Sequence, residues 1–339
     1  MDNILKFKND PYISVIIPSH SSKFLREAVD SVLNQDDIDK NEFEIIVVKD
    51  YEDKYIETYL DNNMVKHFTI EENDVGSKLK VGFEKSNGEI LTFLEDDDEY
   101  TKKKLSYVRE AFLNNSKLTL FRNSAILIDV NGENIKSASD SCKCVQVIRE
   151  RFEKKFFFML RNGAASNTST MAVRKSHLIV FSEFFGSFIG IPDFVIFILS
   201  VYKGNCISLC NSPITKIRIH PSWSRIYGNF EDFLARRKEY QMNTLKTIDV
   251  LLNVIDDEFI ITFLNQVNTM NEIIGRSYST LFLSHRISEY LESSLLAIKL
   301  KGYILLFYFF SSFIIDKISP RFRYLVFMFF AIYRKKFLG

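Results

Sequence analysis

Residues 88–98 read Gly-Glu-Ile-Leu-Thr-Phe-Leu-Glu-Asp-Asp-Asp, and Glu99 extends the acidic end of this segment. A short apolar run such as Ile90–Leu94 is typical of a strand that is buried on both faces of a parallel sheet. The carboxylates of Glu95–Glu99 follow this strand directly, and they repel one another unless a cation offsets their charge. The segment therefore predicts a buried strand that presents an acidic site at its carboxyl end.

Two earlier segments repeat the apolar run, at Ile13–Ile17 and Phe43–Val48. The residues between the runs have apolar positions at helical spacing, so each segment has one stripe to lay on a sheet. These positions are Phe24, Leu25, Ala28, Val29, Val32 and Leu33 in the first segment, and Tyr55, Ile56, Tyr59 and Leu60 in the second. Strands that alternate with helices predict an α/β domain, with a mostly parallel sheet covered by helices on both faces.

The chain continues with a mixed pattern of strands and one helix, which we assign to the second half of the same domain, residues 1–228. The expected strands are Leu118–Asp129, Thr168–Arg174, Cys206–Cys210 and Ile214–Ile219, and the expected helix is Pro192–Tyr202. Strand patterns end after this point. Helical periodicity predicts a helical appendage over residues 229–300.

Residues 301–339 form an aromatic and basic tail with apolar runs at Gly302–Ile315 and Tyr324–Tyr333. Each run is shorter than the roughly 20 apolar residues that a spanning helix needs. Two interpretations stay open, a pair of helices at a membrane surface and a buried helical pair, and the aromatic content favours the membrane. Because Met1–Pro11 lacks the apolar core of a signal peptide, we expect a cytoplasmic protein, peripherally associated with the inner face of the cell membrane.

The overall charge gives no general attraction to nucleic acid, because 44 lysines and arginines offset 43 aspartates and glutamates in 339 residues. No nucleic-acid partner is expected. The cysteines Cys142, Cys144, Cys206 and Cys210 have no neighbouring histidines that would complete a zinc site. We expect them to be reduced thiols in or near strands.

The acidic run is suited to a hard divalent ion, since Mg²⁺ and Mn²⁺ prefer carboxylate oxygens and can bridge them to phosphate. If the run is extended, alternate residues point the same way, so Glu95 and Asp97 should share one face. The alternative is a solvated acidic turn. The position of the acidic run directly after a buried strand favours a functional site, because ligands of such sheets bind beyond the carboxyl ends of the strands.

Four segments together resemble the family 2 glycosyltransferases: Ile13–His20, the helix end Ser31–Gln35, Phe43–Asp50 and Gly88–Asp98. The resemblance covers roughly residues 11–225 and is strongest up to Tyr107. It implies the GT-A fold and transfer of a sugar from a nucleoside diphosphate, with inversion at the anomeric carbon. The expected donor is a UDP-sugar and the expected acceptor a saccharide or lipid-linked saccharide, in the synthesis of cell-surface polysaccharide or glycolipid.

The resemblance also implies roles for single residues near the strand ends. Asp97 is similar to the family's principal metal ligand for Mn²⁺ or Mg²⁺, and Glu95, where the family usually has aspartate, should reach ribose or metal. The nucleotide-sugar contacts implied are Pro18, Ser19, His20, Asp50, Glu95 and Asp96, with Asp50 at the base or ribose.

The sequence departs from the family pattern in two places. Lys49-Asp50 stands where two adjacent aspartates are frequent, and Gly76–Gly82 lacks the usual Arg-Asn pair. Lys78 or Lys80 could supply the missing positive charge as a contact to diphosphate. The alternative is that each is an ordinary exposed lysine of a helix.

Asp193 is the residue that resembles the family's catalytic base, an aspartate that opens a helix about a hundred residues after the acids. Here Pro192 replaces a preceding glutamate and favours the helix start. The alternative role of Asp193 is a first-turn acid that complements the helix dipole. Further along, His220 is a candidate for an additional metal or phosphate contact, and Trp223 for part of the sugar or acceptor wall.

Two other functions compete with glycosyl transfer. A nucleotidyltransferase would normally carry a glycine-rich basic loop after the first strand, and Pro18–Ser22 contains no glycine. A noncatalytic, membrane-associated protein that binds a sugar nucleotide is compatible with the changes at Leu79–Lys80 and Pro192. Because all the acids are retained, we favour the enzyme.

Overall fold

The computed structural model describes residues 11–135, 143–219 and 230–268. The chain divides into two compact units, the first made of residues 1–225 and 246–261, the second of residues 226–245 and 262–339. The division into domains at residues 228 and 300, which the sequence suggests, stays a prediction.

The first unit alternates strands and helices in its N-terminal half and becomes mixed afterwards. The strands are β1 (Ile13–Ser19), β2 (Phe43–Lys49), β3 (Lys66–Thr69), β4 (Ile90–Phe93), β5 (Glu99–Tyr100), β6 (Leu118–Ile128), β7 (Cys144–Ile148), β8 (Met171–Arg174) and β9 (Cys206–Arg218). The helices are α1 (Leu25–Leu33), α2 (Lys54–Asn62), α3 (Val75–Lys85), α4 (Lys104–Asn114), α5 (Phe152–Arg161), α6 (Lys175–Leu178) and α7 (Pro192–Lys203). Short 3₁₀ segments are η1 (Arg149–Arg151), η2 (Thr168–Thr170) and η3 (Ile179–Ser187), and α8 (Phe230–Val254) passes from the second unit into the first.

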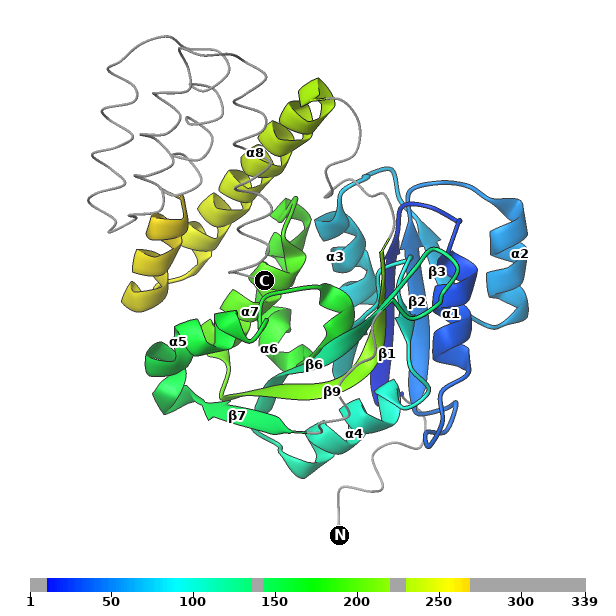
Figure 1. The fold of residues 1–339 in the computed structure, drawn as a ribbon, viewed down its shortest axis with the longest axis horizontal. Helices are drawn as coiled ribbons and strands as arrows, with labels where there is room; N and C mark the ends of the chain where they lie inside the picture. The colour runs from blue at the N-terminus through cyan, green and yellow to red at the C-terminus, as the bar shows by residue number, and fades with distance from the viewer. Residues whose placement is uncertain (1–10, 136–142, 220–229, 269–339) are drawn as a thin grey trace. The chain divides into compact units, whose positions relative to one another are not determined.

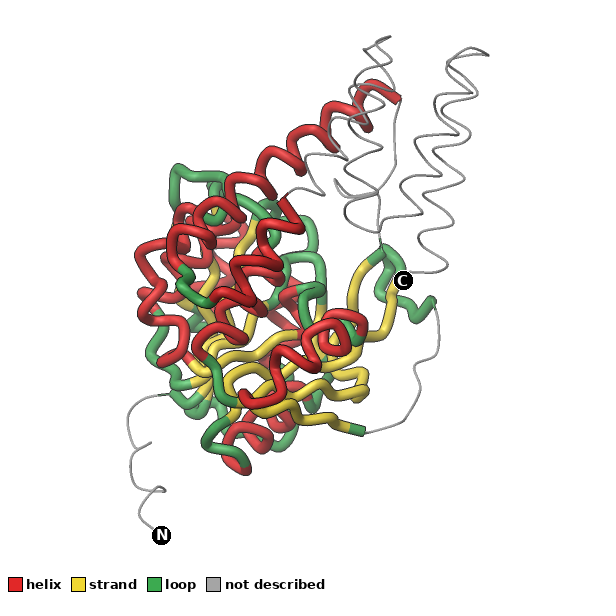
Figure 2. The backbone as a smooth tube through the Cα atoms, turned by 90° about the vertical axis from the view of Figure 1, so that its left-hand side faces the viewer, coloured by secondary structure: helices red, strands yellow, loops and turns green. Residues whose placement is uncertain are grey.

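The strands form one sheet in the order β3-β2-β1-β4-β8-β6-β9-β5, with β7 paired to β9. The pairs among β1, β2, β3 and β4 are all parallel, as the alternation of strands and helices predicts. Beyond β4 the sheet is mixed, because β8 runs antiparallel to both β4 and β6 while β6 and β9 are parallel. Figure 2 shows these strands side by side, with helices packed along them.

Helices cover both faces of the parallel part, and the alternation along β1 decides which side chain meets which helix. Ile13, Val15 and Ile17 belong to the buried cluster that includes the apolar stripes of α1, α2 and α4. Ile16 points to the opposite face, where its side chain lies directly under Gly82 of α3. Figure 1 shows α1 and α2 on one side of these strands and α3 on the other. The predicted α/β fold with helices on both faces is confirmed.

Individual elements also agree with the sequence patterns. The expected strands Ile13–Ile17, Phe43–Val48 and Ile90–Leu94 are β1, β2 and β4, and the expected helix Pro192–Tyr202 is α7. The two expected strands Cys206–Cys210 and Ile214–Ile219 are one strand, β9, because it continues across Pro213 through an irregularity in its pairing with β6.

The cysteines differ from the reduced thiols expected. Cys144 and Cys210 are direct partners in the antiparallel pairing of β7 with β9, with Cα atoms 4.1 Å apart, and they form a disulfide. Their separation of 66 residues conceals this proximity in the sequence. Cys206 is a buried free thiol. Cys142 lies outside the described residues.

No helix among the described residues has both the length and the apolar character needed to cross a membrane. The apolar runs 302–315 and 324–333 lie outside the described part of the chain. Their association with a membrane surface therefore stays a prediction.

Helix α3 packs closely on η3 and the residue after it at Gly76, which leaves no room for a Cβ atom. A Cβ atom at this position would lie 2.2 Å from the Phe188 carbonyl oxygen and 2.5 Å from that of Phe185. Because both obstacles are backbone, we expect Gly76→Ala to lower the free energy of unfolding by about 1–3 kcal/mol, measured by urea denaturation. Gly186→Ala is the control, since its Cβ would meet only the Lys80 side chain at 3.4 Å. Equal stability of the two variants would contradict this packing.

Candidate active site

The acidic run is a turn that follows β4, and it is not extended as we expected. The amide of Asp98 donates to the carbonyl of Glu95 at 3.1 Å, which folds the backbone back on itself. Glu95 and Asp97 do come together, but the turn also brings Asp98 to them. Oxygen atoms of these three carboxylates lie within 4.8 Å of one another. The site is therefore a cluster of three acids at the end of a buried strand.

The η2 segment supplies hydrogen bonds to two acids of this cluster. Thr168 Oγ1 donates to Glu95 Oε1 at 2.9 Å, and Ser169 Oγ donates to Asp98 Oδ2 at 2.7 Å. The Glu95 amide in turn donates to Ser169 Oγ at 3.0 Å. Asp98 Oδ1 accepts from the amide of Arg218 at 2.9 Å. Asp98 is thus fixed from both sides.

Burial and mutual repulsion perturb the acids strongly. Burial raises the pKa of Asp98 to about 7, with a further contribution from the charge of Asp97. Burial also raises the pKa of Glu95 well above its ordinary value, and the charges of Asp98, Asp97 and Asp193 act in the same direction. Carboxyl groups that are costly to ionise in this way are suited to a site where a cation offsets their charge.

Asp96 points away from the cluster and ties down the loop after β1. Its Oδ2 atom accepts from the amides of His20 and Ser21 at 2.7 and 3.0 Å and from Ser19 Oγ at 2.9 Å. Pro18 is buried within β1, where it lies opposite Val48 of β2. The predicted nucleotide loop is therefore anchored to the acidic turn by one carboxylate.

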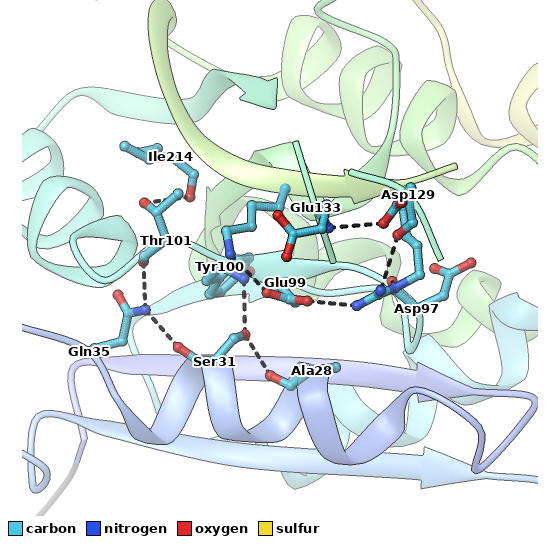
Figure 3. A network of polar contacts seen from close by, with 12 residues as sticks. Ala28, Ser31, Gln35, Asp97, Glu99, Tyr100, Thr101, Asp129, Glu133 and Ile214 are labelled. Carbon is cyan, nitrogen blue, oxygen red and sulfur yellow. Dashed lines mark hydrogen bonds and ion pairs between the residues drawn. The ribbon is translucent and has the colours of Figure 1, made fainter. Parts of the chain in front are cut away.

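Arg218, near the end of β9, connects the acidic turn to the surrounding elements. Its guanidinium donates to the carbonyl of Asp97 at 2.9 Å, to Glu99 Oε1 at 2.6 Å and to the carbonyl of Asp129 at 3.2 Å. Glu99 is thereby neutralised outside the acid cluster. Figure 3 shows the contacts of Asp97, Glu99 and Asp129 in this network. It also shows the Tyr100 amide donating to Ser31 of α1, and Gln35, which follows α1, donating to the carbonyl of Thr101.

Lys78 forms a buried ion pair with Asp50, so the two predicted nucleotide contacts meet. Lys78 Nζ lies 3.0 Å from Asp50 Oδ2 and 2.5 Å from Nδ1 of His20. Burial opposes ionisation of both groups, but the hydrogen bond and charge of Lys78 keep the pKa of Asp50 below its ordinary value. Burial lowers the pKa of Lys78, which Asp50 partly offsets. His20, Asp50 and Lys78 therefore form one cluster at the ends of β1 and β2.

Lys80 lies on a different side of α3, and its ammonium approaches Glu84 of the same helix at 3.9 Å. We expect Lys78→Met to lower the free energy of unfolding by about 2–4 kcal/mol, since it leaves the Asp50 carboxylate without its buried partner. Lys80→Met should change it by less than about 0.5 kcal/mol. Urea denaturation of both variants tests this difference, and a small effect at Lys78 would show that the ion pair contributes little.

Asp193 lies in the first turn of α7 and is linked to the acid cluster through Asn167. Asp193 Oδ2 accepts from the amide of Asn167 at 2.9 Å, and Oδ1 accepts from the amide of Phe194 at 2.9 Å. Asn167 Nδ2 donates to Asp98 Oδ2 at 3.3 Å. Burial raises the pKa of Asp193, although these amides act to lower it. A carboxylate with a raised pKa is a better proton acceptor near neutral pH.

A divalent cation fits the acid cluster. Its donors are carboxylate oxygens, which hard cations prefer, and a bound cation would offset the burial and mutual repulsion that raise the pKa values of Glu95 and Asp98. Glu95 and Asp97 would hold the ion. Asp98 would support them, since both its oxygens already accept hydrogen bonds. The candidate ligand His220 lies outside the described residues, as does Trp223.

The residues that hold the acids in place are not evident from the sequence pattern. Thr168 and Ser169 were expected to begin the strand Thr168–Arg174, but they lie in η2, and only Met171–Arg174 is a strand. Asn167 and the support from Arg218 were not predicted. A polar Ser-Asn-Thr-Ser stretch before an apolar strand was the available signal. Polar side chains so close to a buried strand need partners, but the sequence alone does not say which.

Comparison with known proteins places this site in a family. Residues 14–181 match glycosyl transferase family 2, a segment that begins within β1 and contains β2 and the acidic turn. The chain belongs to glycosyl transferase family 2. It is 30% identical over 144 residues to an uncharacterized glycosyltransferase of Haemophilus influenzae, a match that covers 40% of this chain and 55% of that relative. The match thus spans about half the length of this relative.

Solved structures show the same fold. The structure of S. aureus TarS 1–349 with UDP-GlcNAc matches with a TM-score of 0.56 and 16% identity, covering 90% of this chain and 88% of that one. The complex of the same TarS fragment with UDP matches with a TM-score of 0.51 and 18% identity, over the same shares of both chains. The GT-A fold expected for a family 2 protein is thereby confirmed.

Proposed function

We propose that this protein transfers a sugar from a nucleoside diphosphate, with a UDP-sugar as donor, to a saccharide or lipid-linked acceptor with inversion at the anomeric carbon. The observation that carries the proposal is the pairing of two separate carboxylate sites. The acid cluster after β4 and Asp193 of α7 are joined through a single residue, Asn167. Inverting transfer requires one site at the leaving diphosphate and another at the attacking hydroxyl.

In this reaction Asp193 accepts the proton of the acceptor hydroxyl as the oxygen attacks the anomeric carbon. The amides of Asn167 and Phe194 orient its carboxylate, and burial raises its pKa toward the range in which it can hold that proton. Glu95 and Asp97 would hold Mn²⁺ or Mg²⁺, which when bound offsets the charge of the departing diphosphate. The cluster of His20, Asp50 and Lys78 offers donors and an acceptor to the nucleoside portion.

The UDP-GlcNAc and UDP complexes of TarS support a sugar nucleotide bound on this fold. Purified protein should be screened against a panel of UDP-sugars and other nucleotide sugars by thermal shift, with and without Mn²⁺. Any donor that stabilises the protein is then tested for slow, metal-dependent release of nucleoside diphosphate. Binding without any release would favour the noncatalytic sugar-nucleotide-binding protein, and no binding to any donor would refute both.

The proposal extends to location and biological context. Association of residues 301–339 with the inner face of the cell membrane would place the enzyme near a lipid-linked acceptor, in the synthesis of cell-surface polysaccharide or glycolipid. This part of the proposal rests on the aromatic runs and basic residues of the tail sequence.

A further inference from the structure

Asn167 has an unusual backbone conformation that several hydrogen bonds hold in place. Its backbone has a φ of 56° and a ψ of 110°, a conformation that residues other than glycine rarely adopt. Its carbonyl accepts from the amide of Thr170 at 3.1 Å and from Thr170 Oγ1 at 2.8 Å, and its own amide donates to Asp193. Strained backbone of this kind persists where the surrounding structure fixes it, and such positions cluster at functional sites.

The side-chain amide of Asn167 is oriented by its neighbour. Nδ2 donates to the carboxylate of Asp98, so the other end of the amide, Oδ1, cannot exchange places with it without meeting that carboxylate. Oδ1 is buried and accepts no hydrogen bond from any described residue. A buried carbonyl oxygen without a donor is costly, and in a functional site it indicates a group that a ligand satisfies.

The position of Asn167 identifies that ligand group. In an inverting substitution the attacking oxygen and the leaving group lie on opposite sides of the anomeric carbon, so the donor sugar lies between the base and the diphosphate site. Asn167 is bonded to Asp193 on one side and to Asp98 of the acid cluster on the other. The side-chain oxygen Oδ1 of Asn167, held between these two carboxylates, would therefore lie beside the sugar ring of a bound donor.

We propose that Asn167 is a specificity-determining residue whose Oδ1 accepts a hydrogen bond from a hydroxyl of the donor sugar. This inference rests on the proposed function. The backbone amide of Asn167 also donates to Asp193, so recognition of the sugar and orientation of the base depend on one residue. A sugar that lacks the matching hydroxyl leaves Oδ1 buried without a donor and is bound less tightly.

Asn167→Gly tests this contact, because glycine adopts the positive φ at no cost and keeps the amide that donates to Asp193. Calorimetry with Mn²⁺ at mildly alkaline pH compares binding of UDP with binding of the UDP-sugar that the wild type prefers in the screen. We expect the preference for the UDP-sugar over UDP to fall by about three- to tenfold, the contribution of one hydrogen bond. Binding of UDP itself should change much less.

Ser166→Ala is the matched control, since Ser166 directly precedes Asn167 and is exposed, and among the described residues its hydroxyl bonds to the carbonyl of Gly163 alone. It should keep the wild-type preference, and an equal loss there would overturn the proposal. Equal weakening of UDP and UDP-sugar in Asn167→Gly, together with weaker Mn²⁺ binding, would show that Asn167 acts through its bond to Asp98 of the acid cluster and not on the sugar, and would also overturn the proposal.

The proposed function and this inference fail in different ways. If the wild type releases UDP from a UDP-sugar while Asn167→Gly keeps its full preference for that sugar, the inference is wrong and the function stands. If the wild type neither prefers nor hydrolyses any sugar nucleotide, both are wrong. Asn167→Ala adds a check, because alanine lacks the side-chain amide, as glycine does, but is strained at the positive φ. Asn167→Ala should therefore be less stable than Asn167→Gly.

Discussion

Asp193→Asn is expected to lower turnover by about 10²–10⁴-fold, the usual contribution of a general base, while the affinity for the donor stays near that of the wild type. The reason is that the amide side chain cannot accept the proton of the attacking hydroxyl, whereas the donor is held elsewhere, by the acid cluster and the loop after β1. Initial rates with saturating donor and calorimetric affinities for UDP measure the two quantities separately.

The control for Asp193 is another aspartate at the start of a helix. Asp257 accepts from the amide of Ile260 at 3.0 Å and takes no part in the site. Asp257→Asn should leave both stability and turnover nearly unchanged, since asparagine caps a helix about as well as aspartate. If Asp193→Asn retains more than about a tenth of wild-type turnover, another residue is the base, and Asp193 is only a first-turn acid of α7.

Asp97→Asn should abolish metal-dependent binding of UDP, with a loss of at least the roughly 10–100-fold that even the outer partners of a metal contribute. The fold should be retained or stabilised, because removing the charge of Asp97 relieves the repulsion that raises the pKa values of Glu95 and Asp98. Calorimetry of UDP with and without Mn²⁺ measures the first effect. Unchanged affinity with Mn²⁺ would refute the metal assignment.

The effect of Asp97→Asn on stability should depend on pH. A buried carboxyl group whose pKa is raised keeps its proton in the folded state after the unfolded chain has lost it, so its contribution to stability falls as pH rises. For Asp98 this range extends from the ordinary carboxylate value of about 4 to about 7. Between these values the metal-free wild type should lose stability as pH rises, and Asp97→Asn should lose less.

Urea denaturation near both ends of this range, with and without Mn²⁺, measures that difference. Mn²⁺ should stabilise the wild type most at the higher pH, where the carboxyl groups are ionised, and should stabilise Asp97→Asn little. Asp39→Asn is the control, since Asp39 is exposed in another acidic loop, and it should behave like the wild type. A wild type whose stability rises across this range would contradict the perturbed acids.

The sequence by itself determined the first half of the fold and the location of the site. The apolar runs at Ile13–Ile17, Phe43–Val48 and Ile90–Leu94 are local patterns, and each corresponds to a strand of the structure. A short run of consecutive apolar residues is enough to indicate a strand that is buried on both faces of a sheet. The acids after β4 were found for the same reason, since charge placed directly after a buried strand is visible in the order of residues. Membership in family 2 followed from these segments.

The tertiary structure decided how the site is held together, because its supports come from distant parts of the chain. Asp98 is fixed by Ser169, Asn167 and Arg218, and Lys78 meets Asp50 across the ends of two elements. Lys78 and Lys80 are indistinguishable by composition, and only the rotation of α3 buries one and leaves the other beside Glu84. Hydrogen-bond partners and burial depend on contacts between residues far apart in sequence, which no local pattern encodes.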